Sequence, residues 1–243
     1  MEEHPITWSL IIANTLIFIL VFSMPETMRD SVFLSYSFSI ETLHEFWRLF
    51  TSLFLHADAA HLFFNMLGLY FFGKCLEETI EPGWYLAIYF MSGFLGEVAF
   101  MMTSPLPVIG ASGCIFGVMG AAMLLNPVKR IHFYIFPLPL GMVALLFVFM
   151  ETFVIYFQRD FGNIAHYAHI GGLITGSLFA FFYDFKTSMK GIFVLIACIF
   201  LLIFLGSIIG LITGTGTIIL SILNLIIGAV LYTVAGMLSF LWS

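Results

Sequence analysis

The sequence predicts an all-α protein that crosses a membrane several times. Of its 243 residues, 61% are hydrophobic and only 9% are charged, whereas a soluble domain carries about 25% charged residues. The apolar residues are gathered into long stretches that are separated by short polar segments. A helix needs about 20 apolar residues to cross the roughly 30 Å hydrocarbon core of a bilayer. We therefore expect lipid to be the main solvent of this chain.

Eight apolar segments of spanning or near-spanning length account for most of the chain. The predicted helices cover residues 8–23, 59–73, 83–103, 112–125, 138–157, 165–183, 191–212 and 217–241. The first follows the acidic residues Glu2 and Glu3 without a clear cleavage site after it, so we expect a membrane helix and not a signal peptide. Only residues 213–216 divide the last two segments, and the sequence leaves open whether they form one helix or two.

The basic residues predict the orientation in the membrane. Five of the eight fall on the side of the N-terminus and three on the other side. The five are Lys74, Lys129, Arg130, Lys186 and Lys190, and the three are Arg29, Arg48 and Arg159. Because cytoplasmic loops carry an excess of Lys and Arg, we expect the N-terminus to lie in the cytoplasm.

A serine motif opens the fourth predicted helix. Gly110-Ala111-Ser112-Gly113 follows Pro105 and Pro107, which keep the backbone from being helical until about Gly110. The helix to residue 125 then rises only about 21 Å, so Ser112 is expected to begin it below the outer membrane surface. A hydroxyl there lies among unpaired N–H groups that would stabilise an oxyanion. The alternative is a capping serine beside packing glycines.

A second polar cluster runs from His56 to Asn65. His61 and Asn65 are four residues apart and therefore share one helical face, and Asp58 is placed to cap the helix. The helix to Gly73 is short, at roughly 22 Å, so we expect its outer end to be submerged too. Two hydrogen-bonding side chains in register suit an oxyanion hole, or they form a helix–helix pair. His56 points elsewhere and is expected to brace a loop.

A third cluster, His166-Tyr167-Ala168-His169-Ile170-Gly171-Gly172, opens the sixth predicted helix. His169 lies about one turn into that helix, and its face otherwise holds small residues. These are Ala165, Gly172, Gly176 and Ala180, and a matching face below Ser112 holds Gly113, Gly117 and Ala121. Small faces let helices approach closely in lipid, so we expect a contact that brings Ser112 and His169 together. His166 either orients His169, lines a water entrance or has a structural role.

These clusters favour nucleophilic chemistry by a Ser–His dyad. Serine needs a base to take its proton, and neutral histidine has a suitable pKa. No aspartate is placed to complete a triad, and we expect structural roles for Glu97 and Glu151. A zinc protease would need His-Glu-x-x-His, which is absent. A transporter also uses helices that begin within the membrane, but it would predict a repeated half that the sequence lacks.

Taken together, the motifs resemble those of the rhomboid family of intramembrane serine proteases. The resemblance spans residues 47–180, and five motifs stand in the order of the family. They are Trp47-Arg48, His56 with His61-x-x-x-Asn65, Gly73 with Leu76-Glu77, Gly110-Ala111-Ser112-Gly113, and Ala168-His169-Ile170-Gly171-Gly172. By this resemblance Ser112 is the nucleophile and His169 the base. His61, Asn65 and the backbone N–H of Ser112 form the oxyanion hole, with His56, Gly110, Gly113, Phe116 and His166 in supporting positions.

The resemblance also implies an architecture and a class of substrate. It implies a six-helix catalytic core over residues 1–190, followed by one or two additional transmembrane helices in residues 191–243. The substrates would be transmembrane proteins in the bilayer of the cell membrane, cut near the outer face, with no cofactor, metal or nucleic acid. Trp47-Arg48 would shape the outer loop and have no catalytic part.

Two features depart from the family pattern. Phe116 stands where some relatives have a tyrosine that packs against the catalytic histidine, so the ring is kept and the hydroxyl is lost. The segment after residue 190 extends beyond the six-helix core. The main alternative is a rhomboid-like binding protein without activity, and the intact Ser112, His169, His61 and Asn65 argue against it.

Overall fold

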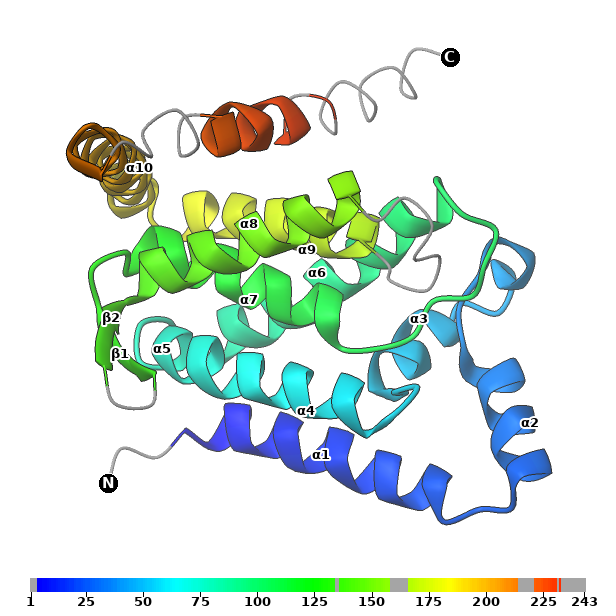
Figure 1. The fold of residues 1–243 in the computed structure, drawn as a ribbon. Coiled ribbons are helices and arrows are strands. Elements are labelled where there is room, and N and C mark those ends of the chain that lie inside the picture. The colour runs from blue at the N-terminus through cyan, green and yellow to red at the C-terminus, as the bar shows by residue number, and fades with distance from the viewer. Residues whose placement is uncertain (1–3, 134–135, 158–165, 214–220, 231, 233–243) are drawn as a thin grey trace.

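The protein is mostly helical in the computed structural model, which describes residues 4–133, 136–157, 166–213, 221–230 and 232. Six of the helices run alongside one another (Figure 1). They are α1 (Pro5–Phe22), α4 (Ala59–Gly68), α6 (Pro82–Met101), α7 (Ser112–Leu125), α8 (Leu140–Phe157) and α9 (His166–Tyr183). Four helices within the described ranges are long and apolar enough to cross a membrane.

Helix α7 is central to this arrangement. It begins at Ser112 and ends at Leu125, as the prolines and Gly110 predicted. Most of its residues are buried, and it packs against α6, α9, α8 and α4. Because α7 lies among several helices, the residue at its N-terminus is held from several sides.

The second predicted helix is longer than expected. Helix α4 continues through one π-helical turn, η3 (Leu69–Gly73), into α5 (Lys74–Glu77), which gives an apolar span of 19 residues. The prediction of a short helix that ends at Gly73 is therefore wrong, because the π turn absorbs Gly73 without ending the helix. Asp58 caps this helix as predicted, accepting a hydrogen bond from the His61 N–H at 2.8 Å.

Two regions that were expected to be irregular contain secondary structure. Between α1 and α4 lie α2 (Glu26–Tyr36), η1 (Ile40–Thr42), α3 (Arg48–Thr51) and η2 (Ser52–Phe54). Between α7 and α8, the strands β1 (Arg130–Phe133) and β2 (Phe136–Pro139) form an antiparallel hairpin. The all-α expectation is therefore corrected at this hairpin, where two prolines (Pro137 and Pro139) suit an edge strand better than a helix interior.

The C-terminal part begins earlier than predicted. Helix α10 (Phe185–Thr213) starts six residues before the expected residue 191, so the predicted core boundary at residue 190 falls inside a helix. It contacts α7, α8 and α9, and Gly191 lies against the Leu124 carbonyl while Leu195 lies beside Gly141. A further apolar helix covers Ser221–Val230. Residues 214–220 and 233–243 lie outside the described residues, so the number of additional helices stays a prediction.

Glycines set the spacing of α6, α7 and α9. A Cβ built at Gly172 would overlap the Gly113 carbonyl, and one at Gly176 would overlap the Gly117 carbonyl. A Cβ at Gly96 of α6 would lie 2.5 Å from the Ala168 carbonyl oxygen. The predicted contact between the two small faces is thus present for the described residues, and Ala165 lies outside them. Backbones this close can place two side chains from different helices within hydrogen-bonding distance.

Candidate active site

The contact between α7 and α9 brings Ser112 and His169 together. Ser112 is the first residue of α7, and His169 lies in the first turn of α9. The Nε2 of His169 is 2.7 Å from the Oγ of Ser112, a hydrogen-bonding distance between residues 57 positions apart in the chain. This is the geometry that a base needs to accept the proton of a hydroxyl nucleophile.

Phe116 and His166 bound the ring of His169 on two sides. The Phe116 ring is stacked on the imidazole, with centroids 4.4 Å apart and planes 2° from parallel. Phe116 is four residues after Ser112 and therefore lies one turn below it on α7. The His166 ring stands perpendicular to that of His169, with centroids 6.3 Å apart. The stacked Phe116 restricts how the imidazole can turn away from Ser112, although it offers no hydroxyl to orient it.

A second group of polar side chains meets beside Gly110. The backbone of Gly110 has a φ of +113°, a region that residues with a Cβ rarely adopt. A Cβ built there would lie 2.8 Å from the Nε2 of His61 and 3.7 Å from the Nδ2 of Asn65. Glycine therefore allows the His61 ring to approach the backbone two residues before Ser112, and the Asn65 amide lies at ordinary contact distance from the same point. This contact, and not the length of their helix, places His61 and Asn65 at the level of Ser112.

His61 and Asn65 each have an N–H donor near Gly110 that makes no hydrogen bond among the described residues. The Nδ1 of His61 accepts from the Ala57 N–H at 3.4 Å, so in the neutral ring the proton is on Nε2, the nitrogen that faces Gly110. Asn65 is 8% exposed, and its Nδ2 has no hydrogen-bond partner within the described residues. A buried donor without a partner costs about 1–3 kcal/mol. Both side chains are thus prepared to donate to an oxygen that binds there.

His56 packs against the ring of His61. Its ring is buried and packs edge-to-face on the His61 ring, with centroids 5.0 Å apart. Burial, with a smaller effect from His61, lowers the pKa of His56 to about 3, because the charged form loses its hydration. A neutral ring in this position packs against His61, and the expectation that His56 braces a loop stays a prediction.

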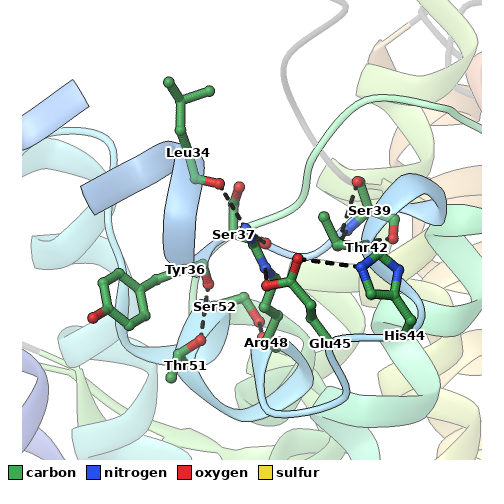
Figure 2. Close-up of polar contacts among 10 residues, drawn as sticks. All are labelled: Leu34, Tyr36, Ser37, Ser39, Thr42, His44, Glu45, Arg48, Thr51 and Ser52. Carbon is green, nitrogen blue, oxygen red and sulfur yellow. Dashed lines mark hydrogen bonds and ion pairs between the residues drawn. The ribbon is translucent and has the colours of Figure 1, made fainter. Parts of the chain in front are cut away.

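The segment that carries Gly110 is tied to the loop between α1 and α4. Phe38 and Val108 form an antiparallel bridge with N···O distances of 3.2 and 2.8 Å, and the Gly110 N–H donates to the Ser52 carbonyl at 2.9 Å. Arg48 organises that loop by donating to the carbonyls of Leu34 and Ser37 and to Glu45 (Figure 2). Sequence reasoning missed Ser52, Phe38 and Val108, which carry no motif that would have singled them out.

Comparison with known proteins identifies the family. Residues 43–186, more than half of the chain, match the family model of the rhomboid domain. The chain belongs to the rhomboid family. As a rhomboid protein with several apolar helices, it is a multi-pass membrane protein.

Relatives of this rhomboid protein include proteins named as proteases and one named as inactive. Rhomboid protease GluP of Bacillus subtilis (strain 168) is 36% identical over 132 residues, which cover 54% of this chain and 25% of GluP. Rhomboid protease GlpG of Salmonella choleraesuis (strain SC-B67) is 28% identical over 180 residues, or 73% of this chain and 62% of GlpG. Inactive RHOMBOID-like protein 8 of Arabidopsis thaliana is 34% identical over 134 residues, or 54% of this chain and 36% of that protein. In each case the match covers less than two thirds of the relative.

Proposed function

We propose that this rhomboid protein is an intramembrane serine endopeptidase. The observation that carries the proposal is the 2.7 Å contact between the His169 Nε2 and the Ser112 Oγ, at the N-terminus of a helix. The donors of His61 and Asn65 beside Gly110 support it, because they flank the position where the substrate carbonyl oxygen would lie.

The reaction follows from the roles of these groups. His169 takes the Ser112 proton while Oγ attacks the substrate carbonyl carbon, and the carbonyl oxygen becomes an oxyanion. The Ser112 N–H belongs to the first turn of α7, where N–H groups lack helical partners, and it donates to that oxyanion together with His61 and Asn65. His169 then gives its proton to the leaving amine. Water hydrolyses the acyl-enzyme by the same steps, so a dyad suffices.

The proposed substrates are transmembrane helices of other membrane proteins. A helix hides its carbonyls in its own hydrogen bonds, so the substrate must unwind locally before Ser112 can attack. We therefore expect helix-weakening residues near the cut and a small side chain before it. With the N-terminus in the cytoplasm of a cell-membrane protein, the site would open to the outer face. No cofactor or metal takes part in these steps.

Cleavage of a transmembrane substrate by purified protein in liposomes tests the proposal. Wild type should cleave, and Ser112→Ala and His169→Ala should lose at least about 10³-fold in kcat/KM. Ser188→Ala, a buried serine of α10, serves as the matched control and should cleave like wild type. Undiminished cleavage by either site variant would refute the mechanism.

The relative named as inactive gives a second candidate, a rhomboid protein that binds transmembrane helices without cutting them. Folded wild type that binds a substrate helix but neither cleaves it nor reacts with a fluorophosphonate would favour this candidate. Flux of a solute through proteoliposomes would instead favour a transporter.

A further inference from the structure

A buried carboxyl group on α6 contacts the loop that holds the Gly110 segment. Glu97 is 2% exposed, and its Oε1 lies 2.5 Å from the Oγ of Ser52, which is fully buried. The neighbouring Gly96 packs against the Ala168 backbone, so Glu97 lies at the level of His169. The dyad mechanism uses neither Glu97 nor Ser52, although both are buried polar groups close to the site.

The number of protons available at Ser52 indicates whether the Glu97 carboxyl group is protonated. The Ser52 Oγ lies 2.5 Å from the Arg48 carbonyl oxygen as well as from Glu97. A serine hydroxyl has one proton, and a backbone carbonyl can only accept. If Ser52 donates to Arg48, the short contact with Glu97 needs a proton from the carboxyl group. A neutral glutamic acid that donates to Ser52 therefore satisfies both contacts.

Ser52 connects this acid to the candidate oxyanion hole. Its side chain meets Glu97, and its own carbonyl accepts the Gly110 N–H at 2.9 Å. Gly110 is the residue whose backbone lies against His61 and Asn65, two positions before Ser112. The path from α6 to the oxyanion donors therefore consists of two hydrogen bonds and one serine residue (Ser52 and Arg48 are drawn in Figure 2).

The charge of Glu97 would also affect an oxyanion that forms at the site. An oxyanion that forms beside Gly110 would be repelled by a carboxylate on a neighbouring buried helix, since two like charges are weakly screened in the protein interior. A neutral acid keeps the hydrogen bond to Ser52 and removes that repulsion. Both the contact with Ser52 and the nearby oxyanion therefore favour a neutral Glu97.

We propose that Glu97, as a neutral acid, is a positioning residue that holds Gly110 through Ser52 and so fixes the oxyanion donors around the Ser112 site. The proposal rests on the proposed protease function. Glu97 itself touches neither substrate nor Ser112 in this mechanism.

Three substitutions at Glu97 and Ser52 test the positioning role. Glu97→Gln keeps an N–H donor for Ser52 without any charge, whereas Glu97→Leu keeps the volume and removes all hydrogen bonding. We expect Glu97→Leu to lower kcat about 10- to 100-fold with KM unchanged, because a displacement of about 1 Å can have that effect. Glu97→Gln should stay within about threefold of wild type by the same reasoning. Ser52→Ala, which removes one oxygen atom, should lower kcat in the same direction and serves if Glu97→Leu does not fold.

Glu77→Ala supplies the control for a merely structural effect. Glu77 is also hydrogen-bonded and partly buried, but it lies at the other end of the α4–α5 span. The substitution Glu77→Ala should lower the thermal midpoint of unfolding, while the kcat of the folded fraction stays at the wild-type value. Hydrogen exchange of the peptide that contains Gly110 gives a second readout without turnover: exchange should become faster in Glu97→Leu and stay at the wild-type rate in Glu97→Gln and Glu77→Ala.

The two readouts separate this proposal from the proposed function. Wild-type kcat together with wild-type exchange at Gly110 in Glu97→Leu would overturn the positioning role and leave the protease proposal intact. Glu97→Gln as impaired as Glu97→Leu would overturn the neutral-acid assignment. If wild type itself does not cleave, the protease proposal fails, and exchange at Gly110 still decides whether Glu97 holds the loop.

Discussion

Glu77 and Asn65, two polar residues toward opposite ends of the α4–α5 span, differ in whether their hydrogen bonds are made. At the opposite end from the site, Glu77 accepts hydrogen bonds from the Ile6 N–H at 2.7 Å, the Thr7 N–H at 2.9 Å and the Thr7 hydroxyl at 2.6 Å. At the site end, the Asn65 Nδ2 is buried without a partner among the described residues. The Glu77 carboxylate is therefore used for structure, whereas the Asn65 Nδ2 near Gly110 is left able to bind a further oxygen.

Hydrogen bonding distinguishes structural from potentially reactive polar groups in a membrane protein. Burying a polar group is favourable only when its hydrogen bonds are made, and Glu77 meets that condition three times over. The Nδ2 of Asn65 does not meet it among the described residues. It faces a positive-φ glycine two residues before Ser112, which is the arrangement that the proposed oxyanion hole requires.

The largest expected effect concerns the unpaired donor. Asn65→Ala should lower kcat about 10²- to 10³-fold, the usual loss for one oxyanion donor, with little loss of stability because no described hydrogen bond of the Nδ2 is broken. Kinetics on a transmembrane substrate and a thermal melt of the same sample measure both quantities. If Asn65→Ala retains wild-type kcat, the contrast between the two ends is wrong.

The opposite pattern is expected at Glu77. Glu77→Ala removes three hydrogen bonds at the start of α1 and should lower the free energy of unfolding by about 2 kcal/mol, as hydrogen bonds to charged groups do. The kcat of the folded fraction should not change. Chemical denaturation in micelles measures the loss, and a fall in kcat without a fall in stability would contradict the assignment.

A smaller effect concerns the pH dependence of stability. The pKa of His56 is about 3 in the folded protein and about 6.5 when unfolded, so the unfolded chain binds more protons between these values. The contribution of His56 to stability is therefore complete above about pH 6.5 and is lost as the pH falls toward 3. His56→Asn should make the free energy of unfolding fall less between pH 7 and pH 4.5 than in wild type. Equal losses in both proteins would show that His56 is not buried in neutral form.

The smallest effect is expected for the ion pair between Lys129 and Glu78. The two side chains are 34% and 27% exposed, and such pairs contribute at most about 1 kcal/mol. Lys129→Ala should therefore lower the free energy of unfolding by less than about 1 kcal/mol, and added salt should reduce even that difference. A loss as large as that of Glu77→Ala would mean that the Glu77 end depends on charge as much as on hydrogen bonds.

Residues with strong backbone preferences allowed the most accurate predictions. Pro105, Pro107 and Gly110 predicted the start of α7 at Ser112, and Asp58 predicted the cap of α4. The small faces with Gly113 and Gly172 predicted which helices meet, because close packing in lipid depends on residue size, which can be read from the sequence.

The parts that could not be predicted depend on contacts between distant residues. The rotation of α6 could not be derived from its apolar sequence, so the contact of Glu97 with Ser52 became visible only in the structure. The short elements α2 and α3 were missed because a loop of mixed polarity has no clear period. The π turn before α5 was missed because its residues suit an ordinary helix equally well.

Labelling with a fluorophosphonate probe shows whether Ser112 is an activated nucleophile, since the probe forms a bond only with an activated serine. Wild type in bilayers should be labelled at Ser112, as located by mass spectrometry, and labelling should fall at least about 10²-fold in His169→Ala because the base is absent. The fold of each sample is checked by its thermal midpoint. A folded wild-type protein that stays unlabelled beside an active rhomboid protease, or equal labelling of wild type and His169→Ala, would contradict the assignment of Ser112 and His169 as nucleophile and base.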